Sequence, residues 1–169
     1  TITPRDFRAL DPANNGGLPV IPQIMSCKAP DFIWGAERMK ELGYPEVNLN
    51  LGCPSGTVTA KGKGSGFLAR LEDLDRFFEE VFSEVTIPVS VKTRMGITDA
   101  EEFHRILEVY NKYPITCVTI HARVQKEKYK GKKYKITNTF TNEEKEVKII
   151  DIDIFKESDS ALMYYLSAN

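Results

Sequence analysis

The chain has 169 residues, of which 41% are hydrophobic and 28% are charged. These fractions are typical of a soluble globular protein and exclude a wholly disordered chain. Its 23 basic side chains nearly balance 24 acidic ones, which gives a formal net charge of −1. The length suits one domain with a buried core, but it is too short for a closed (β/α)₈ barrel, which needs about 250 residues.

The sequence also indicates a cellular compartment. No apolar run approaches the roughly 20 residues of a membrane-spanning helix, and no cleavable signal opens the chain at Thr1. The three cysteines (Cys27, Cys53 and Cys117) are odd in number and lack paired spacing, which fits a reducing cytosol better than a disulfide framework. We therefore expect a cytoplasmic protein without a membrane partner, and we expect no zinc site.

Two periodicities alternate along residues 19–121. Short apolar runs predict buried strands, and apolar residues spaced three and four positions apart predict helices. In chain order, the predicted elements are a strand at 19–25, a helix at 29–42, a strand at 46–51, a helix at 68–85, a strand at 87–93, a helix at 99–113 and a strand at 116–121. This alternation implies right-handed crossovers and a parallel sheet in an α/β fold of about four βα units.

The pattern changes near residue 131. Residues 133–140 and 147–155 alternate polar and apolar side chains, and residues 141–144 between them have the composition of a turn. We therefore predict an α/β domain over residues 1–131 and an unrelated tail over residues 132–169 that contains an antiparallel hairpin.

Charge is distributed unevenly in the same region. Six lysines and a single glutamate lie between residues 126 and 135, whereas acids outnumber lysines after residue 141. Such a density of lysine could contact a phosphate backbone, although a solvated surface loop has the same composition.

Polar and reactive side chains follow the predicted strands at their carboxyl ends. In parallel α/β folds these ends meet at one edge of the sheet, where reactive groups gather. The candidates are Gln23, Asn50, Cys53, Lys92, Arg94, His121 and Arg123. One polar residue at a strand end is usually structural, but four consecutive strands with this feature favour a common site.

Cys53 lies in the sequence Asn50-Leu-Gly-Cys-Pro54. Gly52 and Pro54 favour a tight turn that could project the thiol into a cleft. There the thiol could act as a nucleophile or, when protonated, as a general acid. The other two cysteines are expected to be small packing residues.

A glycine-rich run, residues 55–66, follows this turn. It does not match a phosphate-binding P-loop, because five residues rather than four separate Gly56 from Gly62 and because Gly64 stands where Ser or Thr is required. We expect instead a mobile loop beside the cysteine, with Lys61 and Lys63 available to a polyanion.

Several motifs together carry a resemblance to a known family. They are Pro22-Gln23, Asn50-Leu-Gly-Cys-Pro-Ser55, Gly64-Ser-Gly66, Val91-Lys-Thr-Arg94 and His121-Ala-Arg123 followed by Tyr129-Lys-Gly131. The chain resembles the tRNA-dihydrouridine synthases over about residues 3–131. These flavoenzymes are TIM barrels with a small helical domain, so the resemblance implies a partial (β/α)₈ barrel. It also implies reduction of uridine to dihydrouridine in tRNA by FMN, with NADPH as the reductant.

The resemblance further implies roles for the residues that match. Cys53 would be the catalytic general acid that protonates C5 of uracil while hydride reaches C6. Flavin contacts would come from Gln23, Lys92 and His121, and the flipped uracil would be held by Asn50, Arg94 and Tyr129. These residue types suit the chemistry, because hydride addition creates enolate-like charge that a proton donor and cations stabilise. Base chemistry on folded RNA also requires extruding the nucleotide.

Other functions stay open at this stage. A dihydroorotate-dehydrogenase-like flavin reductase would use similar strand-end residues on a small pyrimidine. A half barrel without activity could be a binding or assembly module. A cysteine hydrolase that pairs Cys53 with His121 is least favoured, because no third residue stands out to orient the base. A partial barrel also leaves two open sheet edges that could drive self-association unless the tail covers one.

Overall fold

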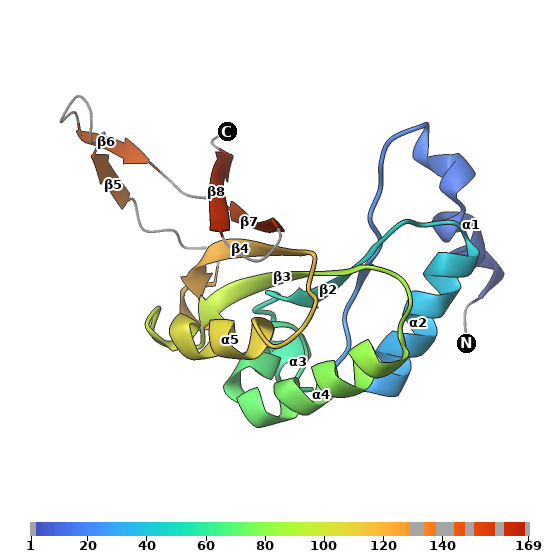
Figure 1. Ribbon diagram of the computed structural model, residues 1–169, viewed down its shortest axis with the longest axis horizontal. Helices are drawn as coiled ribbons and strands as arrows, with labels where there is room; N and C mark the ends of the chain where they lie inside the picture. Colours follow the sequence, from blue (N-terminus) through green and yellow to red (C-terminus); the bar gives the residue numbers. More distant parts are fainter. Residues whose placement is uncertain (1–2, 129–133, 138–143, 148–150, 158–160, 168–169) are drawn as a thin grey trace.

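Four parallel strands and the helices between them form the main body of the computed structural model (Figure 1). The structure describes residues 3–128, 134–137, 144–147, 151–157 and 161–167. The described strands form one six-stranded sheet in the order β1-β2-β3-β4-β7-β8 and a separate two-stranded sheet, β5-β6. Among the described residues, no helix has both the length and the apolar character needed to cross a bilayer.

The predicted alternation of strands and helices is confirmed. The strands β1 (Gln23–Ile24), β2 (Val47–Leu51), β3 (Val89–Gly96) and β4 (Cys117–Val124) pair in parallel and in chain order. The crossovers between them contain α2 (Ala29–Glu41), α4 (Leu71–Glu84) and α5 (Glu102–Tyr110). Parallel strands joined by helices are the repeating unit of the (β/α)₈ barrel, so the α/β fold forms part of such a barrel.

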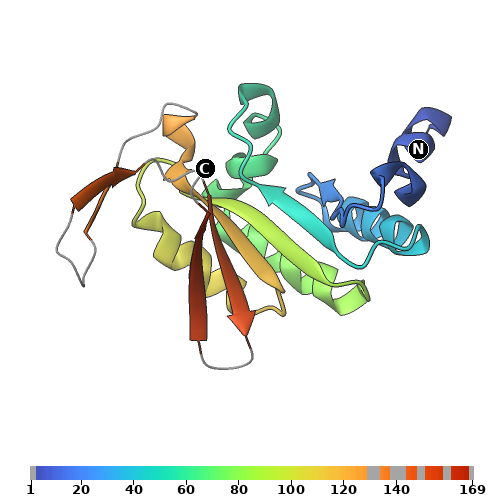
Figure 2. The ribbon, with the colours of Figure 1, turned by 90° about the horizontal axis from the view of Figure 1, so that it is seen from above.

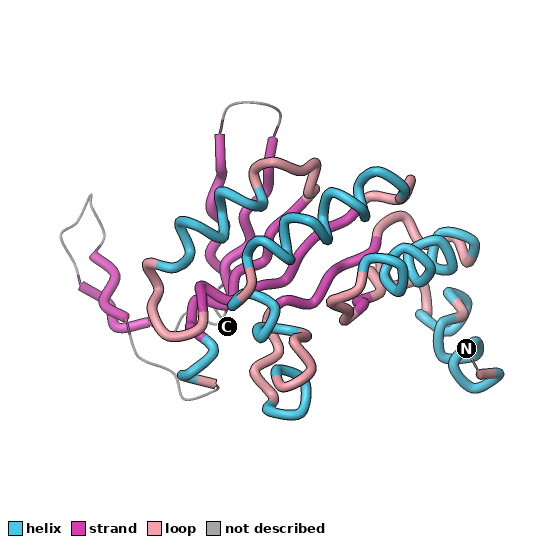
Figure 3. The backbone as a smooth tube through the Cα atoms, turned by 90° about the horizontal axis from the view of Figure 1, so that it is seen from below, coloured by secondary structure: helices cyan, strands magenta, loops and turns pink. Residues whose placement is uncertain are grey.

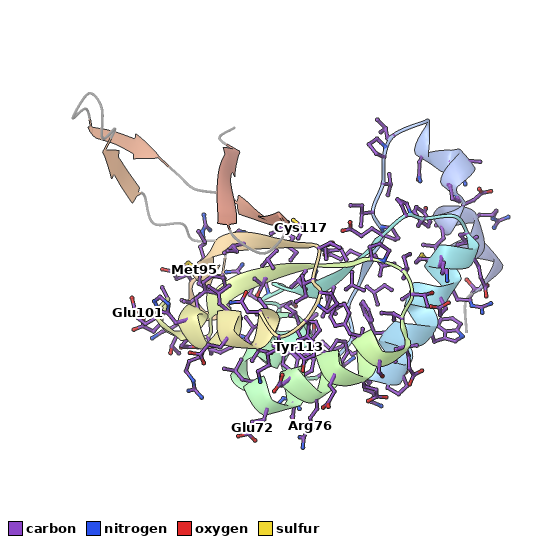
Figure 4. All side chains as sticks on the ribbon, in the orientation of Figure 1. Glu72, Arg76, Met95, Glu101, Tyr113 and Cys117 are labelled. Carbon is purple, nitrogen blue, oxygen red and sulfur yellow. The ribbon has the colours of Figure 1, made fainter. Side chains whose placement is uncertain are left out.

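The three crossover helices lie on the same face of the sheet (Figure 3). Alternate residues of β2 and β3 are apolar and fully buried, among them Leu49, Leu51 and Val91. Phe78 of α4 is fully buried as well, and its ring packs 5.4 Å from that of Tyr113, which follows α5 (Figure 4). This apolar layer between helices and sheet fixes which side chains of each strand face the helices.

The opposite face of the same strands is polar. Successive side chains of a strand point to opposite faces, so the residues between the buried apolar ones point away from the helices. These positions hold Asn48, Asn50, Ser90, Lys92 and His121. In a (β/α)₈ barrel this face is the interior, and the active site opens at the carboxyl ends of its strands.

The first predicted strand is mostly wrong. Only the two residues of β1 within the range 19–25 form a strand, because Pro19 and Pro22 have no amide hydrogen to donate to a neighbour. Val20 and Ile21, which were expected to be buried, are 38% and 48% exposed. β1 is therefore a short edge strand beside exposed apolar residues, and self-association through this edge stays a prediction.

An N-terminal helix that the sequence analysis did not predict precedes this edge. α1 (Pro4–Leu10) begins at a capping box, in which the Thr3 side chain and the Asp6 side chain each bind the other's backbone N–H. The Tyr44 hydroxyl donates a 2.9 Å hydrogen bond to the Leu10 carbonyl. This contact ties the end of α1 to the segment just before β2.

The tail contains two hairpins where one was predicted. β5 (Tyr134–Thr137) pairs with β6 (Glu144–Val147), and β7 (Asp151–Glu157) pairs with β8 (Ala161–Ser167), both antiparallel. Within the predicted strand at 147–155, residue 147 lies in β6 and residues 151–155 lie in β7, whereas 148–150 lie outside the described residues.

The second hairpin joins the main sheet. β7 pairs with β4 in the antiparallel direction, and Figure 2 shows the β7–β8 hairpin beside β4. Since the strands of a (β/α)₈ barrel are all parallel, the barrel-like part of this sheet ends at β4. The tail thus covers one edge of the parallel sheet, while the proposed domain division at residue 131 stays a prediction.

The element ends differ by a few residues from the prediction. β3 and β4 each continue three residues further, to Gly96 and Val124, and α4 and α5 are shorter than expected. α5 begins late because its first residue, Glu102, turns its carboxylate back onto the preceding loop. The carboxylate accepts hydrogen bonds from the backbone of Ile97, Thr98 and Asp99 at 2.8, 3.0 and 2.9 Å, and from the Thr98 hydroxyl at 2.7 Å.

This carboxylate shapes the loop at the carboxyl end of β3. Partial burial raises the pKa of Glu102, but the hydrogen bonds from Ile97, Thr98 and Asp99 outweigh that effect and lower the pKa from 4.5 to about 2. Gly96 has a φ of +154°, and a Cβ there would lie 2.6 Å from the Asp99 carbonyl oxygen and 2.8 Å from the Glu102 Cβ. The loop can close over Glu102 only because residue 96 has no side chain.

We expect Glu102→Gln to lower the free energy of unfolding by about 2 kcal/mol at neutral pH, because a charged acceptor of four hydrogen bonds is lost. A carboxylate with a lowered folded-state pKa stabilises the protein fully above its unfolded value of 4.5, and this contribution is lost as the pH falls toward 2. Urea unfolding should therefore show the wild-type advantage shrinking over that range. The exposed neighbour provides the control: Glu101→Gln should cost less than about 0.5 kcal/mol, and equal losses would contradict the assignment.

Candidate functional site

A cleft of about 220 Å³ opens on the polar face of the parallel sheet. Of the seven residues to which the resemblance gives a role, six line it: Gln23, Asn50, Cys53, Lys92, Arg94 and His121. The seventh, Tyr129, lies outside the described residues. Met25 and Gly52, which the sequence analysis did not name as site residues, complete the lining.

Strand register accounts for this convergence. Asn50 of β2 lies opposite Lys92 of β3, and Arg94 of β3 lies opposite His121 of β4. Paired residues in neighbouring parallel strands point to the same face, so these four side chains share the face that the helices leave open. The roles assigned to them from the resemblance stay predictions.

The turn that carries Cys53 is held by the side chain of Asn50. The Asn50 Oδ1 atom accepts hydrogen bonds from the backbone N–H groups of Gly52 and Cys53, each at 3.0 Å. Such side-chain-to-backbone bonds two and three residues ahead form an Asx turn. The turn brings the half-buried cysteine to the cleft at the end of β2.

The glycine-rich run packs directly against this turn. It forms two short helices, α3 (Gly56–Thr59) and the 3₁₀ helix η2 (Gly64–Ala69), and the expectation that it is mobile stays a prediction. The Ser65 amide and hydroxyl both donate to the Cys53 carbonyl, at 3.0 and 2.9 Å. Gly64 has a φ of +55°, and a Cβ there would lie 2.7 Å from the same carbonyl oxygen. Glycine is therefore required beside the cysteine.

Arg94 is a structural link as well as part of the cleft lining. It is 1% exposed, its Nε donates to the Gly52 carbonyl at 2.7 Å, and its Nη1 donates to the Val124 carbonyl at 3.0 Å. Since Gly52 follows β2 and Val124 ends β4, one guanidinium joins the ends of both neighbours of β3. The sequence analysis, which assigned Arg94 only to uracil, could not foresee these bonds.

Arg123 is another buried guanidinium near this end of the sheet. It is 5% exposed, and its Nε has no hydrogen-bond partner among the described residues. It follows His121 in β4, in the segment where the register between β3 and β4 shifts, and it does not line the cleft. The sequence analysis named Arg123 as a candidate site residue but gave it no role.

A larger groove on the helix side of the sheet is less suited to catalysis. Its volume is about 620 Å³, and it lies between the start of α4 and the start of α5, where its lining includes Arg70, Glu72 and Asp73. Its charged groups partly neutralise one another, since Arg70 pairs with Asp73 at 3.1 Å. Glu72 projects from α4 away from the sheet (Figure 4). None of the six predicted site residues that line the smaller cleft lines this groove. The smaller cleft is therefore the candidate site.

The smaller cleft combines proton donors with positive charge. Lys92 and Arg94 are cationic, the thiol of Cys53 can supply a proton, and the amides of Gln23 and Asn50 supply N–H groups. Such a site favours a ligand with carbonyl oxygens that gain negative charge during a reaction. A protonated thiol near those oxygens can act as a general acid.

The fold and this cleft define a class: α/β proteins built from parallel βα units, with a polar, cationic site on the face of the sheet opposite the helices. The family model described as dihydrouridine synthase matches residues 2–149. The chain therefore belongs to the dihydrouridine synthase family, which confirms the resemblance seen in the sequence. The match continues past residue 131, where the resemblance in the motifs ends.

Curated relatives carry corresponding names. The chain is 34% identical over 109 residues to "Probable tRNA-dihydrouridine synthase 2" of Bacillus subtilis, a match that covers 64% of this chain and 33% of the relative. It is 32% identical over 128 residues to "Probable tRNA-dihydrouridine synthase 1" of Synechocystis, covering 73% of this chain and 34% of the relative. The chain thus spans about a third of the length of the curated relatives it matches.

We expect Arg94→Met to lower the free energy of unfolding by about 2–4 kcal/mol, because the variant leaves two buried carbonyl groups without their charged donor. Arg105→Met, at an exposed position of α5, is the matched control and should change stability by less than about 0.5 kcal/mol. Thermal or urea unfolding followed by circular dichroism measures both. If Arg94→Met were as stable as the control, the hydrogen bonds of Arg94 to the ends of β2 and β4 would not stabilise the fold.

Proposed function

We propose that this chain forms the catalytic cleft of a cytoplasmic enzyme that reduces uridine to dihydrouridine in tRNA, using FMN with NADPH as the reductant. The observation that carries the proposal is the convergence of Cys53, Lys92 and Arg94 on one cleft in a member of this family. The relatives named as tRNA-dihydrouridine synthases support the substrate class. Because the chain spans about a third of those relatives, the complete activity belongs to the proposal.

The donor set of the cleft fits one edge of a flavin ring. The ring presents carbonyl oxygens and ring nitrogens, and Gln23, Lys92 and His121 offer N–H groups and a positive charge to them. The cleft volume of about 220 Å³ suits part of a planar ring rather than a whole FMN molecule. Bound FMN supplies hydride chemistry, which the protein positions and tunes.

The remaining groups of the cleft act on the uracil. Cys53 holds the proton that C5 receives, and the Asx turn of Asn50 sets the backbone from which the thiol extends. Asn50, Arg94 and Tyr129 hold the base, and the cation of Arg94 offsets the negative charge that develops on the uracil oxygens. The uridine reaches this cleft by leaving the RNA stack.

Lysines near the strand ends favour an RNA partner. Lys61, Lys126 and Lys128 are exposed, and Lys63 is half-buried. Lys61 and Lys63 lie beside η2, which packs on the cysteine turn, and Lys126 and Lys128 follow β4. Cations on loops around a base-binding cleft contact the phosphates that flank an extruded nucleotide.

We expect Cys53→Ala to reduce dihydrouridine formation by about 10²–10⁴-fold, because the general acid is removed. The measurement is mass spectrometry of an unmodified tRNA transcript after incubation with the purified chain, FMN and NADPH. FMN binding should be unchanged within about twofold, since the thiol serves proton transfer rather than flavin contact.

Cys117→Ala is the matched control, because Cys117 is the first residue of β4 (Figure 4) and does not line the cleft. It should leave dihydrouridine formation unchanged. If the wild-type chain forms no dihydrouridine, or if Cys53→Ala is as active as Cys117→Ala, the proposal is wrong. Turnover of a free pyrimidine without any response to tRNA would favour a dihydroorotate-dehydrogenase-like enzyme instead.

A non-catalytic binding or assembly module is the second candidate. The observation that favours it is the cleft volume of about 220 Å³, below the roughly 300–1,000 Å³ of a typical small-molecule site. Visible flavin absorption that stays with the chain through gel filtration would exclude this alternative. A colourless chain that still binds tRNA would support it.

A further inference from the structure

A continuous chain of side-chain hydrogen bonds crosses β1, β2 and β3 beneath the candidate site. The Asn50 Nδ2 donates to the Gln23 Oε1 at 2.6 Å, and the Gln23 Nε2 donates to the Asn48 Oδ1 at 2.8 Å. The Asn48 Nδ2 in turn donates to the Ser90 Oγ at 2.9 Å. Two of these residues, Asn48 and Ser90, do not line the cleft.

The orientation of every amide in this chain follows from one fixed point. The backbone N–H groups of Gly52 and Cys53 can only donate, so the Asn50 atom that accepts them must be its oxygen. The Asn50 nitrogen therefore faces Gln23, whose side-chain oxygen must accept the hydrogen bond. The Gln23 nitrogen then faces Asn48, whose side-chain oxygen must accept the next hydrogen bond. Reversing any one amide would place donor against donor or acceptor against acceptor.

This order decides what the cleft offers to a ligand. The Asn50 oxygen accepts two hydrogen bonds from the protein, and the Gln23 oxygen accepts one, from Asn50. Each side-chain nitrogen has two hydrogens and uses one of them in the chain. The remaining N–H of each amide is taken up by no described residue, and both amides line the cleft. The pair therefore presents two N–H donors and at most one acceptor lone pair, on the Gln23 oxygen.

We propose that Asn48 and Ser90 are positioning residues that hold Gln23 and Asn50 with their N–H groups toward carbonyl oxygens of a bound flavin or pyrimidine. Asn48 is the acceptor that keeps the Gln23 amide from reversing, and Ser90 keeps Asn48 in place. The proposal rests on the proposed function for the identity of the ligand. The orientation of the amides itself depends only on the hydrogen bonds.

A pair of substitutions at residue 48 separates this role from packing. Asn48→Leu has a similar size but removes the acceptor for Gln23. Asn48→Asp keeps the acceptor, and its second oxygen can accept from the Ser90 hydroxyl. We expect the dissociation constant of FMN, measured by fluorescence titration, to rise about tenfold in Asn48→Leu and to change less than about threefold in Asn48→Asp. Ser90→Ala should lie between the two.

A second readout does not need a ligand. In ¹⁵N–¹H spectra of the free protein, the side-chain NH₂ signals of Gln23 and Asn50 should show slow hydrogen exchange in the wild-type protein and in Asn48→Asp. The Gln23 signals should exchange about tenfold faster or more in Asn48→Leu, while circular dichroism shows an intact fold. If exchange is the same in all three proteins, or if Asn48→Asp behaves like Asn48→Leu, the proposal is overturned.

The two readouts keep this proposal distinct from the proposed function. A wild-type chain that binds no FMN but shows the expected exchange pattern would contradict the proposed function and support the role of Asn48. A chain that binds FMN equally well in all variants would support flavin binding and overturn the role of Asn48.

Discussion

The register of three parallel strands is the constraint on which the site depends. β2, β3 and β4 place apolar side chains toward the helices and polar side chains on the opposite face. A slip of one residue in any strand would move its polar residues into the apolar layer and its apolar residues into the cleft. The burial of Leu49, Leu51 and Val91 against the helices therefore also places Asn50 and Lys92 on the opposite face. Pairing of β4 with β3 places His121 on that face too.

The same constraint links stability to chemistry at the strand ends. Arg94 is fully buried and joins the ends of β2 and β4, and Glu102 binds the loop that follows β3. A buried guanidinium is costly unless its N–H groups find acceptors, and here backbone carbonyls at the rim of the cleft supply them. Arg94, which lines the cleft, thus also joins the ends of β2 and β4.

The sequence predicts this site better than it predicts the edges of the fold. Period-two and helical patterns are strong where a segment is buried on one face, as in β2 and α4, so the order of elements and the strand-end residues could be deduced. β1 could not, because Pro22 interrupts a run whose side chains are exposed. The chain of bonds through Asn48 and Ser90 could not be deduced either, because it needs the relative register of three strands that are far apart in sequence.

The polar face also restricts what can lie against it. In the orientation proposed above, Gln23 and Asn50 present N–H groups to the cleft, so an apolar surface placed there would leave these two donors without acceptors. A molecule that covers this face must bring acceptors or negative charge. A planar ring with carbonyl edges, such as the flavin of the proposed function, meets that requirement. The fixed orientation of two amides therefore restricts the chemistry of any ligand that lies on this face.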